Sequence, residues 1–323
     1  MTTILTRYLY VYDDVKVALM ISLLNKNQDH SLFWAYEIYY SGFTVEFFDL
    51  IWKIYYDFYS TLNPGFSSYI IKKQKESDET EPGKLVANII LNLLIRPYNL
   101  DMFNQLQYSE LAKQIQDIDD TDAAILQYLT NTPKHQKLIQ TWDKIRYPKK
   151  RILLSYKLHQ SSLQKNLPMG KNLYIHIDSE QLDTIFNTYS TKTIDTLQTY
   201  PHNILKHAVL YSSTESKYHC LFKTEERNPN IMDNWLYYAS FSPIWNKRIN
   251  GTINHEKKQI EFSNIDNEES FYEKYNYEPD EQSLELQQKC INPSPSTNTR
   301  TTLSDFYNEY AQNTTSLFTS LKI

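Results

Sequence analysis

The chain has 323 residues, a net charge of −5 at pH 7 and only 5 glycines, against 27 tyrosines and 14 phenylalanines. Tight phosphate-binding loops and close turns between strands and helices depend on glycine, so this composition argues against doubly wound and barrel enzymes. The length allows one large core or two smaller ones. We expect two domains whose interiors are rich in aromatic rings.

Three helices are predicted in the first sixty residues. Asp13 or Asp14 is expected to cap the first helix. The second covers SLFWAYEIYYSGF, residues 31–43, and Gly42 supplies the left-handed residue that often follows a helix. The third begins at Thr44 and stops before the next proline. It is expected to show water one narrow polar face, formed by Glu46, Asp49, Lys53, Asp57 and Ser60. The chain therefore opens as helix, turn, helix, turn, helix.

The stretch 31–43 has six aromatic side chains and a single charge, Glu37. Its apolar residues lie on all sides of a helix, which is typical of an interior helix, so we predict a core rather than an aromatic binding face. Glu37 must then reach a helix end, accept hydrogen bonds from tyrosine hydroxyls or a base, or have a raised pKa, because an unpaired buried carboxylate is costly. A catalytic acid is the alternative reading, although no second catalytic group is identified beside it.

The middle of the chain continues as helices after a charged segment, residues 72–84, that reads as a surface loop. The helices are predicted at residues 85–95, 101–117, 121–130, 134–146 and 149–166. Antiparallel pairs with short turns bury such segments economically, and no internal repeat of solenoid length is present. Irregular packing of helix hairpins is expected.

The pattern changes after Pro168, where the second half reads as mostly helical with a small sheet. Residues 172–177 alternate like a strand, residues 252–262 read as two strands around a polar turn, and Asn250-Gly251 is a tight-turn signal. Further helices are predicted at residues 179–189, 202–211 and 231–240. The predicted division is a mainly α class with an α-helical domain at 1–167, a mixed α+β domain at 168–291, and a linker with a C-terminal helix at 292–323.

No familiar catalytic or cofactor motif occurs in the chain, neither a phosphate-binding glycine loop nor a paired-histidine or paired-cysteine metal motif. His202, His207 and His219 do not match zinc spacing. We therefore expect no catalytic residue, no cofactor and no metal. Cys220 and Cys290 are too few for a disulfide framework, and no apolar run reaches the ~20 residues of a membrane helix, so we expect no membrane insertion and a reducing cytoplasm.

Charge is distributed unevenly. Residues 134–165 hold nine bases and one acid, a net charge of +8, whereas residues 261–290 hold nine acids and two bases, a net charge of −7. We call these the basic segment and the acidic segment. The basic segment can be solvated or paired within the fold, can bind a protein partner, or can bind nucleic acid with help from Trp142, Tyr147 and Tyr156.

The densest bases of the basic segment flank Pro148, which disfavours helix at the residue before it. This break is expected to place them on an exposed corner suited to docking. The predicted partner-binding residues are Lys144, Arg146, Tyr147, Lys149, Lys150 and Arg151.

The stretches SLFWAYEIYYSGF, FFDLIWKIYYDFYSTLNPGF and DNWLYYASFSPIWNKRI resemble segments of uncharacterised proteins from nucleocytoplasmic large DNA viruses of mimivirus or algal-virus type. The resemblance covers about a quarter of the chain and carries no catalytic residue. It implies a viral protein of the host cytoplasm, in the viral factory, or of the virion.

The functional expectation is a non-enzymatic helical scaffold for protein–protein interaction, acting as a minor capsid or virion-associated subunit of a giant virus, with other proteins of the assembly as partners. The alternative is a nucleic-acid-binding or scaffold subunit of viral transcription or translation machinery, which would use the basic segment 134–165. A salt-dependent shift on RNA or DNA separates the two.

Overall fold

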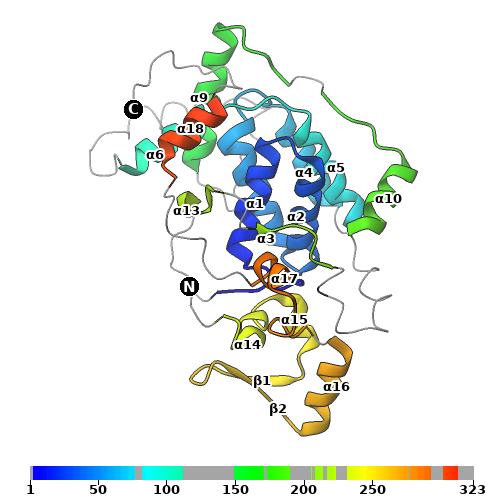
Figure 1. The fold of residues 1–323 in the computed structure, drawn as a ribbon. Helices are drawn as coiled ribbons and strands as arrows, with labels where there is room; N and C mark the ends of the chain where they lie inside the picture. The colour runs from blue at the N-terminus through cyan, green and yellow to red at the C-terminus, as the bar shows by residue number, and fades with distance from the viewer. Residues whose placement is uncertain are drawn as a thin grey trace. The chain divides into compact units, whose positions relative to one another are not determined.

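The structure is a computed structural model, which describes residues 3–76, 82–111, 149–170, 173–189, 205, 208–213, 217–222, 231–275, 277–291 and 301–311. These residues are mainly helical, and their one sheet is a hairpin of two antiparallel strands (Figure 1). The predicted fold class, mainly α with a small hairpin, is confirmed.

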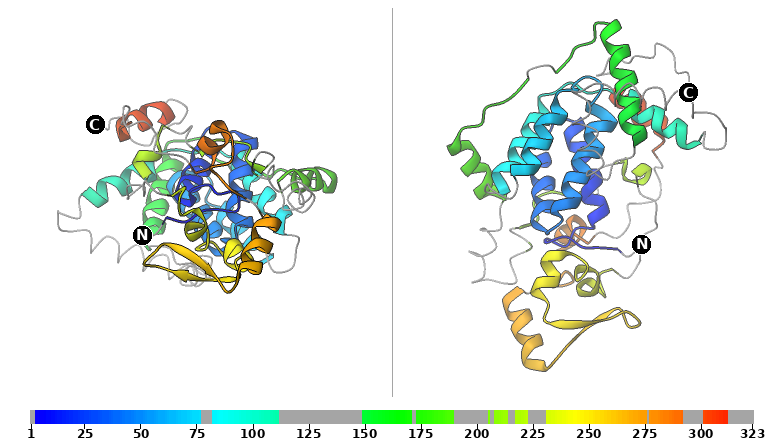
Figure 2. Two further views of the ribbon diagram at one scale, coloured as in Figure 1. Left: turned by 60° about the horizontal axis from the view of Figure 1, so that its bottom comes forward. Right: turned by 180° about the vertical axis from the view of Figure 1, so that it is seen from behind.

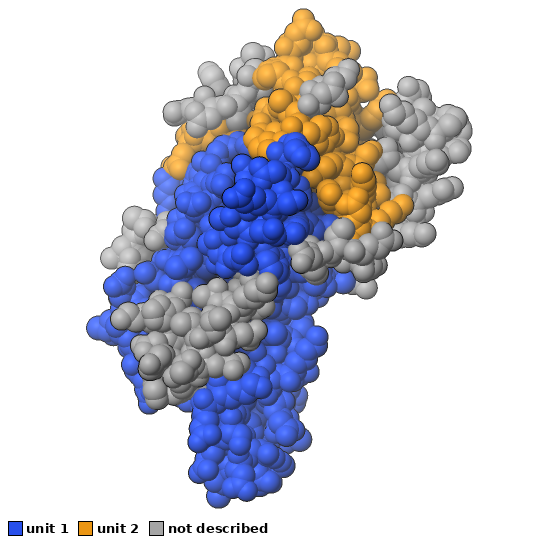
Figure 3. Space-filling view, turned by 90° about the vertical axis from the view of Figure 1, so that its right-hand side faces the viewer, with its two compact units in different colours: residues 1–47, 77–94, 176–303 blue, residues 48–76, 95–175, 304–323 orange. Residues whose placement is uncertain are grey.

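Contacts group the chain into two compact units, coloured in Figure 3. Unit 1 comprises residues 1–47, 77–94 and 176–303, and unit 2 comprises residues 48–76, 95–175 and 304–323. Each unit draws on three separate stretches of chain, because helices that are distant in sequence pack together. The domain boundaries at 167/168 and 291/292, which follow chain order, stay a prediction.

Unit 1 is built on three helices that pack on one another, α1 (Tyr12–Leu24), α2 (Gln28–Tyr40) and α5 (Pro82–Leu94) (Figures 1 and 2). Two further helices join them: α10 (Ser179–Tyr189) packs on α5 and α2, and α13 (His219–Phe222) packs on α1. All of α2 from its second turn to Tyr39 is buried. The prediction that the aromatic stretch forms a core is confirmed.

The aromatic rings of α2 interlock with the residues that precede α1. Tyr10 meets Phe33 and Trp34 edge to face, with ring centroids 5.9 and 5.0 Å apart. Trp34 is 1% exposed and Tyr36 is fully buried, its hydroxyl donating to the Gly83 carbonyl at 2.6 Å. Rings of this size supply much of the apolar area that stabilises a fold.

The C-terminal part of unit 1 carries the hairpin and four short helices. The elements are α14 (Trp235–Ala239), α15 (Pro243–Arg248), β1 (Gly251–Asn254), β2 (Gln259–Phe262), α16 (Ile265–Tyr275) and α17 (Leu284–Lys289). β1 pairs with β2 from Gly251 opposite Phe262 to Asn254 opposite Gln259, as predicted, and α16 lies beside β2 (Figures 1 and 2). Phe271 is the buried residue by which α16 is anchored.

Unit 2 contains most of α3 (Thr44–Ile54) and a π-helical turn, η1 (Tyr55–Tyr59), that directly continues it. The other helices are α4 (Phe66–Glu76), α6 (Asp101–Leu111), α9 (Lys149–Gln164) and α18 (Leu303–Ala311). α6 and α9 pack on η1 and on each other, and their apolar residues close a core. That core is Leu62, Met102, Leu106, Leu158 and Leu167.

Four local predictions are wrong. Val11, not an aspartate, is the N-cap of α1, because Asp14 is drawn into the interior. The predicted loop 72–84 is helical at both of its described ends, which belong to the last turn of α4 and the first turn of α5. Residues 173–177 have strand-like alternation but pair with no strand. Asn250-Gly251 forms no turn, since Gly251 is the first residue of β1. The predicted polar turn between the two strands is confirmed at residues 255–258, where Lys258 adopts φ +53°.

Several predicted helices agree with the structure. α2 is followed by Gly42 at φ +92°, α9 matches the prediction at 149–166, and α10 matches 179–189. α14 is shorter than the predicted 231–240. The predictions at 121–130 and 134–146, most of 202–211, and the linker 292–300 lie outside the described residues. Among the described helices, none is long and apolar enough to cross a membrane.

Candidate functional site

Glu37, the lone charge of the aromatic helix, is fully buried and paired with a buried base. Its Oε2 accepts from Arg7 Nε at 2.8 Å, and its Oε1 accepts from the Tyr8 backbone N–H at 3.0 Å. The exposed fractions of the two side chains are 0% for Glu37 and 1% for Arg7. Glu37 therefore has both of the partners that a buried carboxylate requires, a base and a hydrogen-bond donor.

The backbone around Arg7 is held by its own contacts. Residues 5–11 fold back on themselves, with Leu9 at φ +60° and an isolated bridge between Leu5 and Val11. The Arg7 N–H donates to Ser41 Oγ at 2.8 Å, and its Nη2 donates to the Tyr189 carbonyl at 2.9 Å. The Arg7 guanidinium also lies over the Tyr8 ring, 4.4 Å from its centroid. Three separate segments thus position this one guanidinium.

Burial lowers the pKa of Arg7, but the nearby Tyr8 and Glu37 outweigh that effect and hold it above its ordinary value. Arg7 is therefore a permanent cation in the interior. The expectation that Glu37 is neutralised by a base is confirmed, and its position within the core favours a structural role.

Asp57 is another buried carboxylate, and it lies in the π-helical turn η1. Its Oδ1 accepts from Arg151 Nε at 2.9 Å and its Oδ2 accepts from Lys53 Nζ at 2.8 Å. Asp57 is 1% exposed, whereas Arg151 and Lys53 are 21% and 42% exposed. The helical pattern placed Asp57 on a solvent face, and this is wrong because the widened turn moves it inward.

The predicted partner-binding residues are placed only in part. Lys144, Arg146 and Tyr147 lie outside the described residues, and for Lys149 and Lys150 the structure gives the backbone, in the first turn of α9. Arg151 turns inward to Asp57 and so differs from the expected exposed base. Its partner is a single acid of unit 2, not the acidic segment.

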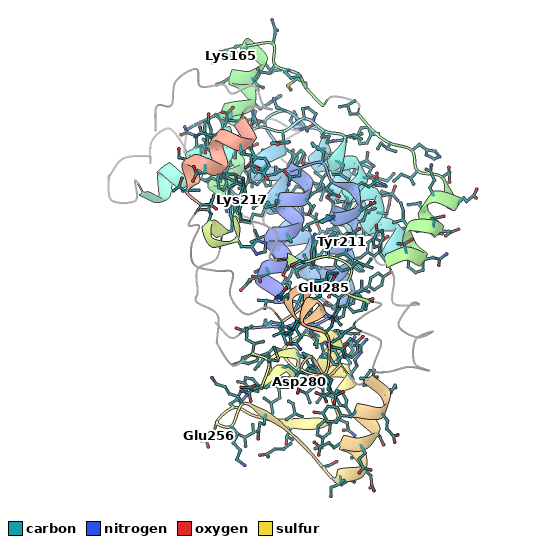
Figure 4. All side chains as sticks on the ribbon, viewed as in Figure 1. Lys165, Tyr211, Lys217, Glu256, Asp280 and Glu285 are labelled. Carbon is teal, nitrogen blue, oxygen red and sulfur yellow. The ribbon has the colours of Figure 1, made fainter. Side chains whose placement is uncertain are left out.

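The acidic segment is exposed over most of its length. Eight of its nine acids are exposed, the exception being the half-buried Glu278. Figure 4 labels Asp280 and Glu285, and also Glu256 on the turn of the hairpin. Ion pairs to this region are local, Lys257 with Glu261 and Lys289 with Glu285. Burial and the neighbouring acids raise the pKa of Glu278 above its ordinary value.

Two large apolar side chains accompany these acids on the surface. Ile265, the first residue of α16, is 72% exposed, and Leu284, the first residue of α17, is 75% exposed. Exposed apolar residues set among charges are typical of contact surfaces. The acidic segment therefore has both the charge and the apolar groups from which a docking surface can be built.

Only some of the histidines and cysteines considered for metal or redox chemistry lie in the described residues. His202 and His207 are outside the described residues, His219 is buried in α13, and Cys290 is a buried free thiol. Within the described residues, no group of three or more metal-ligating side chains comes together. Burial raises the pKa of the Cys290 thiol to about 11.

Sequence reasoning missed two features of these sites, the buried base Arg7 and the burial of Asp57. Arg7 stands alone in the apolar run LTRYLYVY, which was a signal that a buried acid would need it. Asp57 gave no such signal, because the π-turn is not encoded by a simple periodicity.

Comparisons with protein-family models, with curated proteins and with solved structures give no match to this chain.

Proposed function

We propose that this protein is a non-enzymatic helical scaffold for protein–protein interaction, which docks partners through its charged surfaces while its aromatic core gives it rigidity. The observation that carries the proposal is the exposure of the acidic segment 261–290, in which eight of the nine acids and the apolar Ile265 and Leu284 are exposed. A partner of basic surface with an apolar centre fits such a segment.

The ion pairs of Arg151, Glu261 and Glu285 support this reading, because none of them joins one charged segment to the other. Arg151 of the basic segment pairs with Asp57, and the acidic segment has its ion pairs at short range along the chain. Exposed charges contribute little to stability, so a strong local excess of one sign is better explained by association. Electrostatic complementarity speeds association and selects the partner.

The resemblance of three stretches to proteins of large DNA viruses supports a setting for the scaffold. We propose a minor capsid or other virion-associated subunit, made in the host cytoplasm. Mass spectrometry of purified particles of such a virus should then find this chain in stoichiometric amount, and its absence from particles while it is present in infected cells would overturn the virion role.

The docking role is tested with a matched pair of variants in a pull-down from infected cells. Glu268→Gln, Glu269→Gln and Glu273→Gln together remove three exposed acids from α16. Asp29→Asn, Glu46→Gln and Glu180→Gln remove three exposed acids elsewhere, so the net charge changes equally. We expect the first variant to lose its partners at physiological salt and the second to keep them. Equal retention by both would contradict the proposal.

Nuclease treatment of the same pull-down separates the alternative role. Partners that stay bound without RNA and DNA agree with protein docking. If the partners are released by nuclease instead, the chain acts through nucleic acid and the scaffold proposal falls.

A further inference from the structure

Three of the buried donors in unit 1 find no hydrogen-bond acceptor in the described residues and are considered together. They are Arg7 Nη1, Arg248 Nη1 and the hydroxyl of Tyr277. Arg7 is 1% exposed and Tyr277 is fully buried. A buried donor without an acceptor costs about 1–3 kcal/mol, and more when it carries a charge, so three together in a native interior need an explanation.

The three donors belong to one cluster. The Trp245 ring lies 4.8 Å from the Arg248 guanidinium carbon and 4.9 Å, centroid to centroid, from the Tyr277 ring. Its Nε1 donates to the carbonyl of Thr6 at 3.0 Å, next to Arg7 in the chain. A single buried indole therefore connects the segments that carry all three donors.

The electrostatics agree with this arrangement. Burial raises the pKa of Tyr277, while the charges of Arg248 and Arg7 act on it in the opposite direction. Burial likewise raises the pKa of Tyr8, which is also acted on by Arg7 and Arg248. Each tyrosine thus lies within the field of both guanidiniums.

The charges of the cluster do not balance. Arg7 pairs with Glu37, but among the described residues no carboxylate pairs with Arg248, so one guanidinium of the cluster has no counter-charge. Glu37 already accepts from Arg7 Nε and the Tyr8 N–H, and it leaves Arg7 Nη1 without an acceptor. Guanidinium donors have the geometry that oxyanions prefer, and a tyrosine hydroxyl can donate to the same anion.

We propose that Arg7, Arg248 and Tyr277 form an internal binding site for a small oxyanion, of the chemical class of phosphate. One such anion accepts hydrogen bonds from all three donors and removes the excess charge. The anion contacts residues 5–11 through Arg7, α15 through Arg248 and the segment after α16 through Tyr277. It therefore links the hairpin region to the helices of unit 1. Its function is to stabilise this unit, independently of the docking surfaces.

The test measures binding of inorganic phosphate to the full chain by equilibrium dialysis with radiolabelled phosphate, at constant ionic strength set with chloride. We expect saturable binding of one phosphate per chain, and a melting temperature that rises with phosphate but not with added chloride. No saturable binding, or an equal rise with chloride, would overturn the proposal. An equal rise with chloride would mean that salt in general, and not bound phosphate, raises the melting temperature.

Two variants and a control locate the site. Tyr277→Phe keeps the ring against Trp245 and removes one donor, and should weaken phosphate binding about tenfold. Tyr275→Phe removes a hydroxyl from the neighbouring ring, which lies over the same Arg248 at 5.1 Å, and should leave the affinity unchanged. Equal affinity in Tyr277→Phe and the original chain would place the anion elsewhere and overturn the assignment.

Arg248→Gln keeps the test decisive if Tyr277→Phe does not fold, because Arg248 is half-buried and near the surface of the unit. It should also weaken binding at least tenfold. If Tyr277→Phe is instead more stable than the original chain and phosphate has no effect on either, the donors are served by ordered water and no anion site exists.

Discussion

Two of the buried carboxylates, Glu37 of unit 1 and Asp57 of unit 2, are neutralised in opposite ways. Glu37 pairs with Arg7, itself 1% exposed, and with a backbone N–H. Asp57 pairs with Lys53 and Arg151, which are 42% and 21% exposed. Both side chains of the Arg7–Glu37 pair are buried. Around Asp57 only the acid is buried, and its two bases remain in contact with water.

This difference decides what each pair can do. Water can still reach the bases of Asp57, so losing one partner leaves no isolated charge in the interior. Arg7 does not reach water, so the loss of Glu37 would leave a buried cation whose desolvation is not compensated. The Glu37 pair is therefore a condition of folding, and the Asp57 pair is an adjustable contact near the surface.

The first prediction compares the two acids directly. Glu37→Gln should cost about 3–5 kcal/mol of unfolding free energy, because it leaves Arg7 buried beside a neutral group. Asp57→Asn should cost about 1–2 kcal/mol, because Lys53 and Arg151 can turn to water. Urea unfolding followed by circular dichroism measures both losses of free energy. Equal losses would contradict the claim that the fold depends more on Glu37 than on Asp57.

The second prediction concerns alkaline pH. The Cys290 thiol has its pKa raised from 9.0 to about 11 by burial, so the unfolded chain releases this proton at lower pH than the folded one. Its stabilising effect is complete below pH 9 and should fade between pH 9 and about 11, on the order of 2 kcal/mol. Cys290→Ala should flatten the unfolding free energy in that window, and an unchanged slope would show that the thiol titrates normally.

The third prediction separates the two bases of Asp57. Arg151→Gln should cost about 1 kcal/mol, because Arg151 is the more buried base and is fixed on α9. Lys53→Gln should cost about 0.5 kcal/mol or less, since Lys53 is an exposed i,i+4 neighbour of Asp57. Thermal unfolding of the two variants ranks them, and a larger loss from Lys53→Gln would reverse the assignment.

The smallest expected effect is that of salt. Raising the ionic strength from about 0.05 to 0.5 M should weaken the contribution of Lys53 by a few tenths of a kcal/mol through screening. The Arg7–Glu37 pair is sealed, so its contribution should not respond. The measurement is the salt dependence of the free-energy loss in Lys53→Gln and in Glu37→Gln, and a salt-sensitive loss in the latter would mean that water reaches the pair.

The sequence predicted the helices and the hairpin because their signals are local. Apolar residues on all sides of 31–43 predicted its burial, and Gly42 after the helix needs only its own φ angle. Asp57 could not be placed in this way, because the π-turn changes the residues per turn and moves the acid off its expected face. The hydrogen-bond partners of Glu37 and the Trp245 ring beside Tyr277 come from segments far along the chain, which periodicity does not pair.

A double-mutant cycle on Arg7 and Glu37 tests most directly whether this buried pair belongs to the fold. The variants are Arg7→Met, Glu37→Leu and the two together, which remove each charge separately and then both. We predict that each single variant loses about 3–5 kcal/mol of unfolding free energy and that the double variant loses less than either, because it strands no buried charge. Additive losses in the double variant would contradict the account, since Arg7 and Glu37 would then act independently.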